Sequence, residues 1–265
     1  MRQARTILIL LMALAAVLHG QEPRGSNVDV GASPPAVETD AGRPVSWPGL
    51  VPNLVSDQKR IWTFPARLAR GRNWGPVAFV VGVTAALIAT DAKTAGYFRR
   101  TDTFRGFNSV MTGNATLTGV GLTPLILYGV GAARHDRHAR NTALLAGEAV
   151  ADAEILATVF KDIDRRRRPA EYGAGSDFSG SWFSDQGSWV RGIGSFPSGH
   201  TIAAFSVATV LARRYPKHRW IPYLAYGLSG VVGFSRMTLS SHYASDVFLG
   251  GALGYFIGRF AVLRQ

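Results

Sequence analysis

The chain has 265 residues, a length that suits one large domain or two small ones and leaves ample residues for a buried core. The hydrophobic fraction is 47% and the charged fraction only 17%, which excludes wholesale disorder. With no cysteine, a disulfide scaffold, a thiolate metal site, an iron–sulfur cluster and a cysteine nucleophile are all excluded. A formal net charge of +12, with 25 arginines, indicates anionic binding partners such as nucleic acid, anionic lipid or phosphorylated substrates.

The N-terminal end has the pattern of a secretory signal. Arg2 and Arg5 precede an apolar run at residues 7–18, which is too short to cross a bilayer core of about 30 Å comfortably. Because the run ends in a poor cleavage site, cleavage after Gly20 and retention as a short anchor both stay open. Residues 1–20 therefore predict export to the cell envelope.

The rest of the chain divides into an arm and a helical domain. Residues 21–73 show no sustained helical or alternating period, which is typical of an irregular arm or linker. Six apolar segments of helix length follow in residues 74–265, and their length and all-round apolarity predict an all-α domain. The segments are residues 76–90, 116–133, 142–160, 201–212, 221–234 and 247–263.

Whether these helices lie in lipid stays open at the level of sequence. The clean apolar stretches are short for a membrane span, and the third segment carries Glu148, Asp152 and Glu154. Glycines at every fourth position from Gly250 to Gly258 suit close helix packing, which both membrane and soluble helices use. A membrane-embedded form and a soluble periplasmic form are therefore both compatible with the pattern.

The first of three polar clusters follows the third apolar segment. It runs from Lys161 to Pro169 and places Lys161, Arg165 and Arg168 where a helix would unwind, because a proline disfavours helix at the preceding residue. Arginine forks match phosphate oxygens in pairs, and lysine adds a point charge. Taken alone, a run of four arginines is also typical of a solvated or lipid-headgroup face.

The second cluster comes directly before the fourth apolar segment, at residues 196–200. Ser198 can cap the helix, and the free N–H groups of a first helical turn attract an anion. Gly199 lets a ligand approach the backbone, and His200 can protonate a leaving oxygen. Taken alone, the segment also fits an ordinary helix start with an exposed histidine.

The third cluster contains Ser235, Arg236, His242 and Asp246. Since His242 and Asp246 are four residues apart, they would share one face of a helix. A carboxylate there can accept the proton of one ring nitrogen and leave the other nitrogen free as a nucleophile, while Arg236 adds a clamp for phosphate. Taken alone, the pair also fits a surface contact.

Together the three clusters resemble the signature of the type 2 phosphatidic acid phosphatase and vanadium haloperoxidase superfamily. The order is Lys-x6-Arg-Pro, then Pro-Ser-Gly-His, then Ser-Arg-x5-His-x3-Asp, and every signature position is matched. The resemblance covers about residues 74–263, and it implies a six-helix bundle with the active site at one end. The matching residues are Lys161, Arg168, Pro169, Pro197, Ser198, Gly199, His200, Ser235, Arg236, His242 and Asp246.

The resemblance implies a metal-independent phosphatase of the exported bacterial branch, which works through a phosphohistidine. By that logic His242 would attack phosphorus, Asp246 would orient it, and His200 would protonate the departing alcohol. No cofactor is expected. The oxygens of the phosphate would be held by Lys161, Arg168, Ser198, Gly199 and Arg236.

Two other functions stay open. The same pocket could hold vanadate as the cofactor of a haloperoxidase, or the arginines at residues 165–168 could bind anionic lipid without catalysis. The expected partner is a phosphorylated lipid, a prenyl pyrophosphate or a small phosphomonoester, with membrane association and no nucleic acid. The active site is expected to face the periplasm, in a protein that is either integral to the inner membrane or soluble.

Two further features have open interpretations. Residues 170–195 are rich in glycine, serine and aromatic residues, which fits either a mobile aromatic lid or an ordered loop with its aromatic rings in the core. His135 and His138 have a spacing that suits a metal, but the basic loop around them would repel a cation, so no metal site is expected.

Overall fold

The computed structural model describes residues 43–71, 74–173, 175–184 and 192–264. Within these residues every regular element is a helix, which confirms the predicted all-α class. The elements are α2 (Leu50–Trp62), α3 (Phe64–Leu68), α4 (Trp74–Arg100), α5 (Arg105–Val110), α6 (Gly113–Ala133), α7 (Arg137–Asp164), η1 (Pro169–Glu171), α8 (Gly199–Arg214), α9 (Trp220–Thr238), α10 (Ala244–Phe256) and η2 (Ile257–Val262). The predicted signal at residues 1–20 lies outside the described residues and stays a prediction.

All six apolar segments form helices. In chain order they lie in α4, α6, α7, α8, α9 and the continuous pair of α10 and η2. The largest difference is in α4, which continues beyond residue 90 through Asp91 and Lys93 to Arg100. These polar residues end the apolar pattern but not the helix. A helix is held by backbone hydrogen bonds, so it can continue through residues with polar side chains. Asp91 is nevertheless buried, at 2% exposure.

Two helices, α2 and α3, lie within residues 21–73, where an irregular arm was expected. The outer face of α2 is apolar, with Val55 65% exposed, whereas Asp57 on its inner face is fully buried. Asp57 accepts two hydrogen bonds of 2.7 Å from the buried Arg43, which also pairs with Glu148 of α7. Ile61 of the same helix is buried in the hydrophobic core, so the inward face of α2 mixes an apolar residue with a buried charge.

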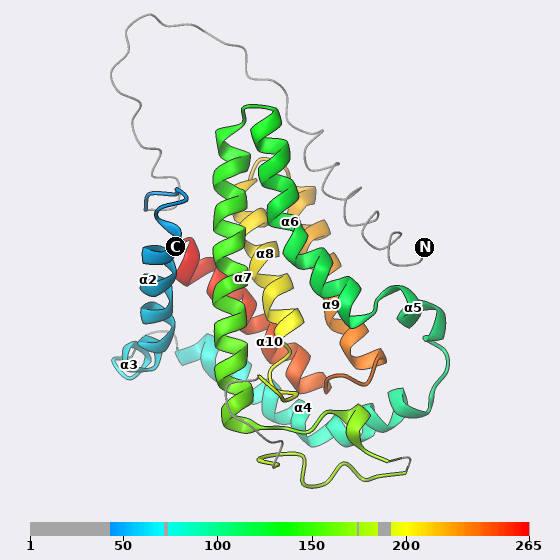
Figure 1. Ribbon diagram of the computed structural model, residues 1–265. Coiled ribbons are helices and arrows are strands. Elements are labelled where there is room, and N and C mark those ends of the chain that lie inside the picture. The colour runs from blue at the N-terminus through cyan, green and yellow to red at the C-terminus, as the bar shows by residue number, and fades with distance from the viewer. Residues whose placement is uncertain (1–42, 72–73, 174, 185–191, 265) are drawn as a thin grey trace, which may run out of the picture.

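The helix α8 lies at the centre of the bundle and packs against α7, α9 and α10 (Figure 1). The contact with α10 is close because small residues line it: a Cβ added to Gly254 would lie 2.8 Å from Cβ of Phe205. A Cβ added to Gly258 would lie 2.7 Å from Cβ of Thr209. The four-residue glycine spacing therefore does mark close helix packing.

The chain returns repeatedly to one end of this bundle. In Figure 1, α7 and α9 end at the lower end, α8 and α10 begin there, and α4 crosses beneath it. All three polar clusters belong to these helix ends. The fold therefore agrees with a site at one end of the bundle.

Two of the described helices are long and apolar enough to cross a membrane, by length and composition. They are α4 and α6. Only 11% of the most apolar window of α4 is buried, against 39% for α6. Since a core helix of a soluble protein would be mostly buried, α4 has the surface expected of a helix that meets an apolar medium.

Candidate active site

The predicted anion-binding residues meet at the lower end of the bundle. Lys161 lies in the last turn of α7, Gly199 is the first residue of α8, and Arg236 lies in the last turn of α9. A Cβ added to Gly199 would lie only 3.2 Å from Nζ of Lys161, so glycine leaves room for the ammonium group beside the start of α8. Residues from three distant parts of the sequence thus share one site.

The four consecutive arginines after α7 have four different environments. Arg165 ends the helix in the left-handed region, with φ of 45°, and so turns the chain. Arg166 points inward and is 2% exposed, whereas Arg167 lies over a tyrosine ring at 4.7 Å. Arg168 is close enough to His242 for its charge to add to burial in lowering the pKa of that histidine. The run is therefore not a single solvated face.

The start of α6 contributes backbone groups to the site. Arg236 is 1% exposed, and its Nη2 donates to the Met111 carbonyl at 2.7 Å and to Oγ of Ser235 at 2.8 Å. The Gly113 carbonyl lies 3.1 Å from Nε2 of His200. Sequence patterns did not indicate these partners, since a backbone carbonyl has no residue-type signal.

His200 is held in one tautomer by this contact. Because a carbonyl only accepts, Nε2 carries the proton, and in the neutral ring Nδ1 is the unprotonated nitrogen. Burial, and after it the charges of Arg236 and Lys161 among others, lowers the pKa of His200 to about 3. A bound dianion would oppose these cations and raise the pKa again, which is the condition a proton donor needs.

The ring of His242 is buried and is held by a hydrogen bond from its Nδ1. Its Nδ1 lies 2.6 Å from the carbonyl of Ser195, so Nδ1 donates and Nε2 keeps its lone pair. Burial lowers the pKa of His242 to about 4 despite the opposing effect of Asp246. The environment therefore favours a neutral ring whose lone pair is on Nε2, the state that a nucleophile requires.

The carboxylate of Asp246 lies near His242 without a direct hydrogen bond to its ring. Its Oδ2 is 3.6 Å from Nδ1 of His242, longer than a hydrogen bond, and it accepts instead from the Ser195 hydroxyl and from the Tyr243 N–H at 2.8 Å. Burial alone would raise the pKa of Asp246, but His242 and Arg166 hold it below its usual value. The direct carboxylate–imidazole hydrogen bond expected from the spacing is replaced by the Ser195 carbonyl.

Ser198 occupies the N-cap position of α8, as predicted, but its side chain makes no capping hydrogen bond. Its Oγ accepts from the Thr201 hydroxyl at 2.9 Å, and its backbone N–H donates to the carbonyl of Asp246 at 3.1 Å. The predicted side-chain cap is therefore wrong. The residue instead joins the start of α8 to the start of α10.

The electrostatics of the site are those of an anion-binding pocket. Burial, and after it the charge of Arg168, lowers the pKa of Lys161. Arg168 also adds to burial in lowering the pKa of Arg236 to about 10. Positive charges that repel one another in this way are stabilised when an anion binds between them. The site can therefore hold the oxygens of a phosphate beside two imidazole rings.

The described part of residues 170–195 packs against the site through Trp182. Trp182 packs on Phe196 with ring centroids 5.1 Å apart and lies 4.2 Å from the guanidinium of Arg166. Phe183 points outward, at 75% exposure. The ordered-loop interpretation accounts for Trp182, whereas Trp189 lies outside the described residues.

His138 has contacts within the protein. Its Nε2 is 2.9 Å from the carbonyl of Arg214 and its Nδ1 is 3.1 Å from Nη2 of the same residue. Within the described residues no group of three or more histidine, cysteine or acidic side chains has an arrangement that could hold a metal ion.

Comparison with known proteins agrees with the signature. The family model of the PAP2 superfamily matches residues 142–265. A lipid A 1-phosphatase from Porphyromonas gingivalis is 38% identical over 65 residues, which are 24% of this chain and 15% of that protein. The matched segment thus spans a small part of the length of that relative.

One solved structure can be superposed on part of this chain. It is a transmembrane PAP2 type phosphatidylglycerolphosphate phosphatase from Bacillus subtilis, with 21% sequence identity and a TM-score of 0.48. The overlap covers 70% of this chain and 91% of the other.

Proposed function

Since the family model of the PAP2 superfamily matches residues 142–265, we propose that this chain is a phosphatase that hydrolyses phosphate monoesters of lipids through a phosphohistidine on His242. The observation that carries the proposal is the state of His242. Its Nδ1 donates to the Ser195 carbonyl, so the lone pair of Nε2 is available, and the positive charges of Arg168 and Lys161 act on the ring.

In the first step, Nε2 of His242 attacks phosphorus and the bond from phosphorus to the ester oxygen breaks. The leaving oxygen takes a proton from His200, whose pKa rises once the phosphate dianion is bound. Lys161, Arg168 and Arg236 hold the remaining oxygens and stabilise the charge of the transition state. The carboxylate of Asp246 stabilises the phosphorylated, positively charged ring.

In the second step, the now neutral His200 accepts a proton from water. The resulting hydroxide attacks phosphorus, the phosphorus–nitrogen bond breaks, and His242 regains its lone pair while inorganic phosphate leaves. All steps use side chains of the protein, so the proposal includes no metal and no cofactor.

A lipid substrate and a membrane location are part of the proposal. They are supported by the relative named a lipid A 1-phosphatase and by the largely exposed apolar surface of α4. The pattern of residues 1–20 supports an orientation in which the site faces the outside of the inner membrane. The substrate would then be a lipid whose phosphate lies at the outer headgroup layer.

The test is hydrolysis of a soluble aryl phosphate and of a lipid phosphate, in detergent with a chelator, by the wild type and by His242→Ala. We expect turnover of both substrates that survives the chelator and is abolished by the substitution, with the protein still folded. Failure of the folded wild type to turn over either substrate would contradict the proposal. Bromide oxidation by peroxide that appears only with added vanadate would instead identify the haloperoxidase.

A further inference from the structure

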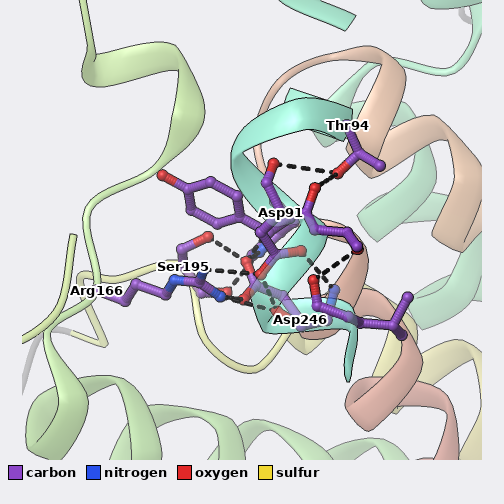
Figure 2. Close-up of polar contacts among 10 residues, drawn as sticks. Asp91, Thr94, Arg166, Ser195 and Asp246 are labelled. Carbon is purple, nitrogen blue, oxygen red and sulfur yellow. Dashed lines mark hydrogen bonds and ion pairs between the residues drawn. The ribbon is translucent and has the colours of Figure 1, made fainter. Parts of the chain in front are cut away.

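A buried ionic cluster lies behind His242 and joins three parts of the chain. Asp91 comes from α4, Arg166 from the connection after α7, and Asp246 from the first turn of α10 (Figure 2). Their exposed fractions are 2%, 2% and 0%, so none of the three charges meets bulk water. Charged groups this deep persist only where they are paired, and each of these is paired within the cluster.

Arg166 is the centre of the cluster. Its Nη1 donates to Oδ1 of Asp246 at 2.6 Å, and its Nη2 donates to Oδ2 of Asp91 at 2.8 Å. The guanidinium also lies between two aromatic rings, 4.2 Å from Trp182 and 3.9 Å from Tyr243. A planar, always charged fork is required for this arrangement, because lysine offers neither two fixed donors nor a flat face.

Asp91 also holds the start of α10 directly. Its Oδ1 accepts from the backbone N–H of Ser245 at 3.1 Å, and its Oδ2 accepts from the hydroxyl of Ser245. The same hydroxyl oxygen accepts from Nη1 of Arg166 at 2.9 Å. Asp91 therefore fixes both the guanidinium that binds Asp246 and the residue that precedes Asp246.

The chain of contacts continues to the histidine. Asp246 accepts from the hydroxyl of Ser195, and the carbonyl of Ser195 accepts from Nδ1 of His242. Asp91, Arg166, Asp246 and Ser195 thus form a continuous series that ends at the ring nitrogen opposite Nε2. In Figure 2 the labelled members of this series converge at one place between α4 and α10.

We propose that Asp91 is a positioning residue, which acts through Arg166 and Asp246 to hold His242 in the tautomer with a free Nε2. The cluster contains two negative charges and one positive charge, so it carries net negative charge beside the ring. Without the charge of Asp91, Arg166 would pair with Asp246 alone, and the cluster would lose its net negative charge. A positively charged His242 would then be less well stabilised. The catalytic part of this inference rests on the proposed phosphatase function.

The test compares Asp91→Asn with Asp57→Asn, a matched control. Asp57 is also buried and paired to a buried arginine, but it lies on α2, away from the site. We expect both variants to lose thermal stability, whereas only Asp91→Asn lowers kcat, by about 10- to 100-fold with KM nearly unchanged. Equal kcat values in the two variants, at a temperature where both are folded, would overturn the proposal.

Two further measurements separate positioning from structural support. In an Arg166→Gln background, Asp91→Asn should cause only a small additional loss of kcat, because the path through Arg166 is already broken and only the contacts of Asp91 with Ser245 are left. An additional loss as large as that in the wild-type background would contradict the proposal. The ¹⁵N signals of histidine-labelled protein, assigned with His242→Gln, should show one tautomer of His242 in the wild type and a mixture in Asp91→Asn. An unchanged tautomer would overturn the inference. This readout needs no turnover, so it stands even if the phosphatase proposal fails.

Discussion

At the scale of single residues, the two histidines of the site are distinguished by their hydrogen-bond partners. His242 donates from Nδ1 to Ser195, and His200 donates from Nε2 to Gly113. The two rings therefore offer opposite nitrogens to the site. Sequence spacing alone could not assign these tautomers, because both acceptors are backbone carbonyls.

The role of His200 predicts a dependence on the leaving group. His200→Gln should reduce turnover of an alkyl or lipid phosphate by about 10²- to 10⁴-fold, but far less for an aryl phosphate whose leaving group needs no proton. The measurement is kcat/KM for both substrates, with His218→Gln as a control in the α8–α9 connection. An equal loss on both substrates would show that His200 binds phosphate rather than donating a proton.

The burial of His242 predicts a pH dependence of stability. Its pKa is about 4 in the folded protein, below the ordinary value of 6.5. Below about pH 6.5 the unfolded chain therefore binds a proton that the folded protein does not, so the free energy of unfolding falls as pH decreases towards 4. The full contribution is on the order of 3 kcal/mol.

This dependence can be isolated with His242→Gln. The variant lacks the titrating ring, so its unfolding midpoint in denaturant should fall less than that of the wild type between about pH 7 and about pH 5. Parallel shifts in the two proteins would contradict a buried, neutral His242.

At the scale of elements, the sequence predicts the helices well and the polar contacts between them poorly. The six apolar segments are all helices, as their length and all-round apolarity predict. The pattern missed α2, whose inward face buries the charge of Asp57 beside the apolar Ile61. It also missed Asp91 and Arg166, because nothing in a helix or in a run of four arginines shows which charge will be buried and paired.

The close contact of α8 and α10 predicts a strong effect of one methyl group. A Cβ at position 254 would meet Phe205 at 2.8 Å and would also press on the Ile202 carbonyl. Gly254→Ala should therefore destabilise the protein by about 1–3 kcal/mol and lower activity, since these helices carry His200 and Asp246.

The control for this prediction is Gly230→Ala on α9, where an added Cβ meets nothing within 4 Å. It should be neutral, or stabilising by up to about 1 kcal/mol, because alanine favours helix over glycine. The measurement is the unfolding midpoint in denaturant. A Gly254→Ala protein as stable as Gly230→Ala would contradict the close packing.

At the scale of the whole molecule, the site and the connection between α8 and α9 lie at opposite ends of the bundle. Arg213 lies in the last turn of α8, and the connection from α8 to α9 carries Lys217 and Arg219, at the end away from the site (Figure 1). Basic loops are typical of the cytoplasmic side of membrane proteins. The proposed orientation therefore places this connection inside and the active site outside.

The lack of cysteine in the chain allows a direct test of this orientation. Phe183→Cys, at an exposed position near the site, should react with a membrane-impermeant maleimide in intact spheroplasts of a Gram-negative host. Lys217→Cys should react only after permeabilisation. The reverse pattern would contradict the orientation, and labelling of both residues without permeabilisation would contradict a spanning bundle.

The central claim is that His242 carries the phosphoryl group during turnover. The most direct measurement is rapid quenching with a ³²P-labelled phosphate monoester, followed by identification of the labelled residue. The account predicts an acid-labile, base-stable phosphoryl group on His242 that forms in the wild type and is absent from His242→Ala. Turnover without any labelled enzyme, or a label on another residue, would contradict the account.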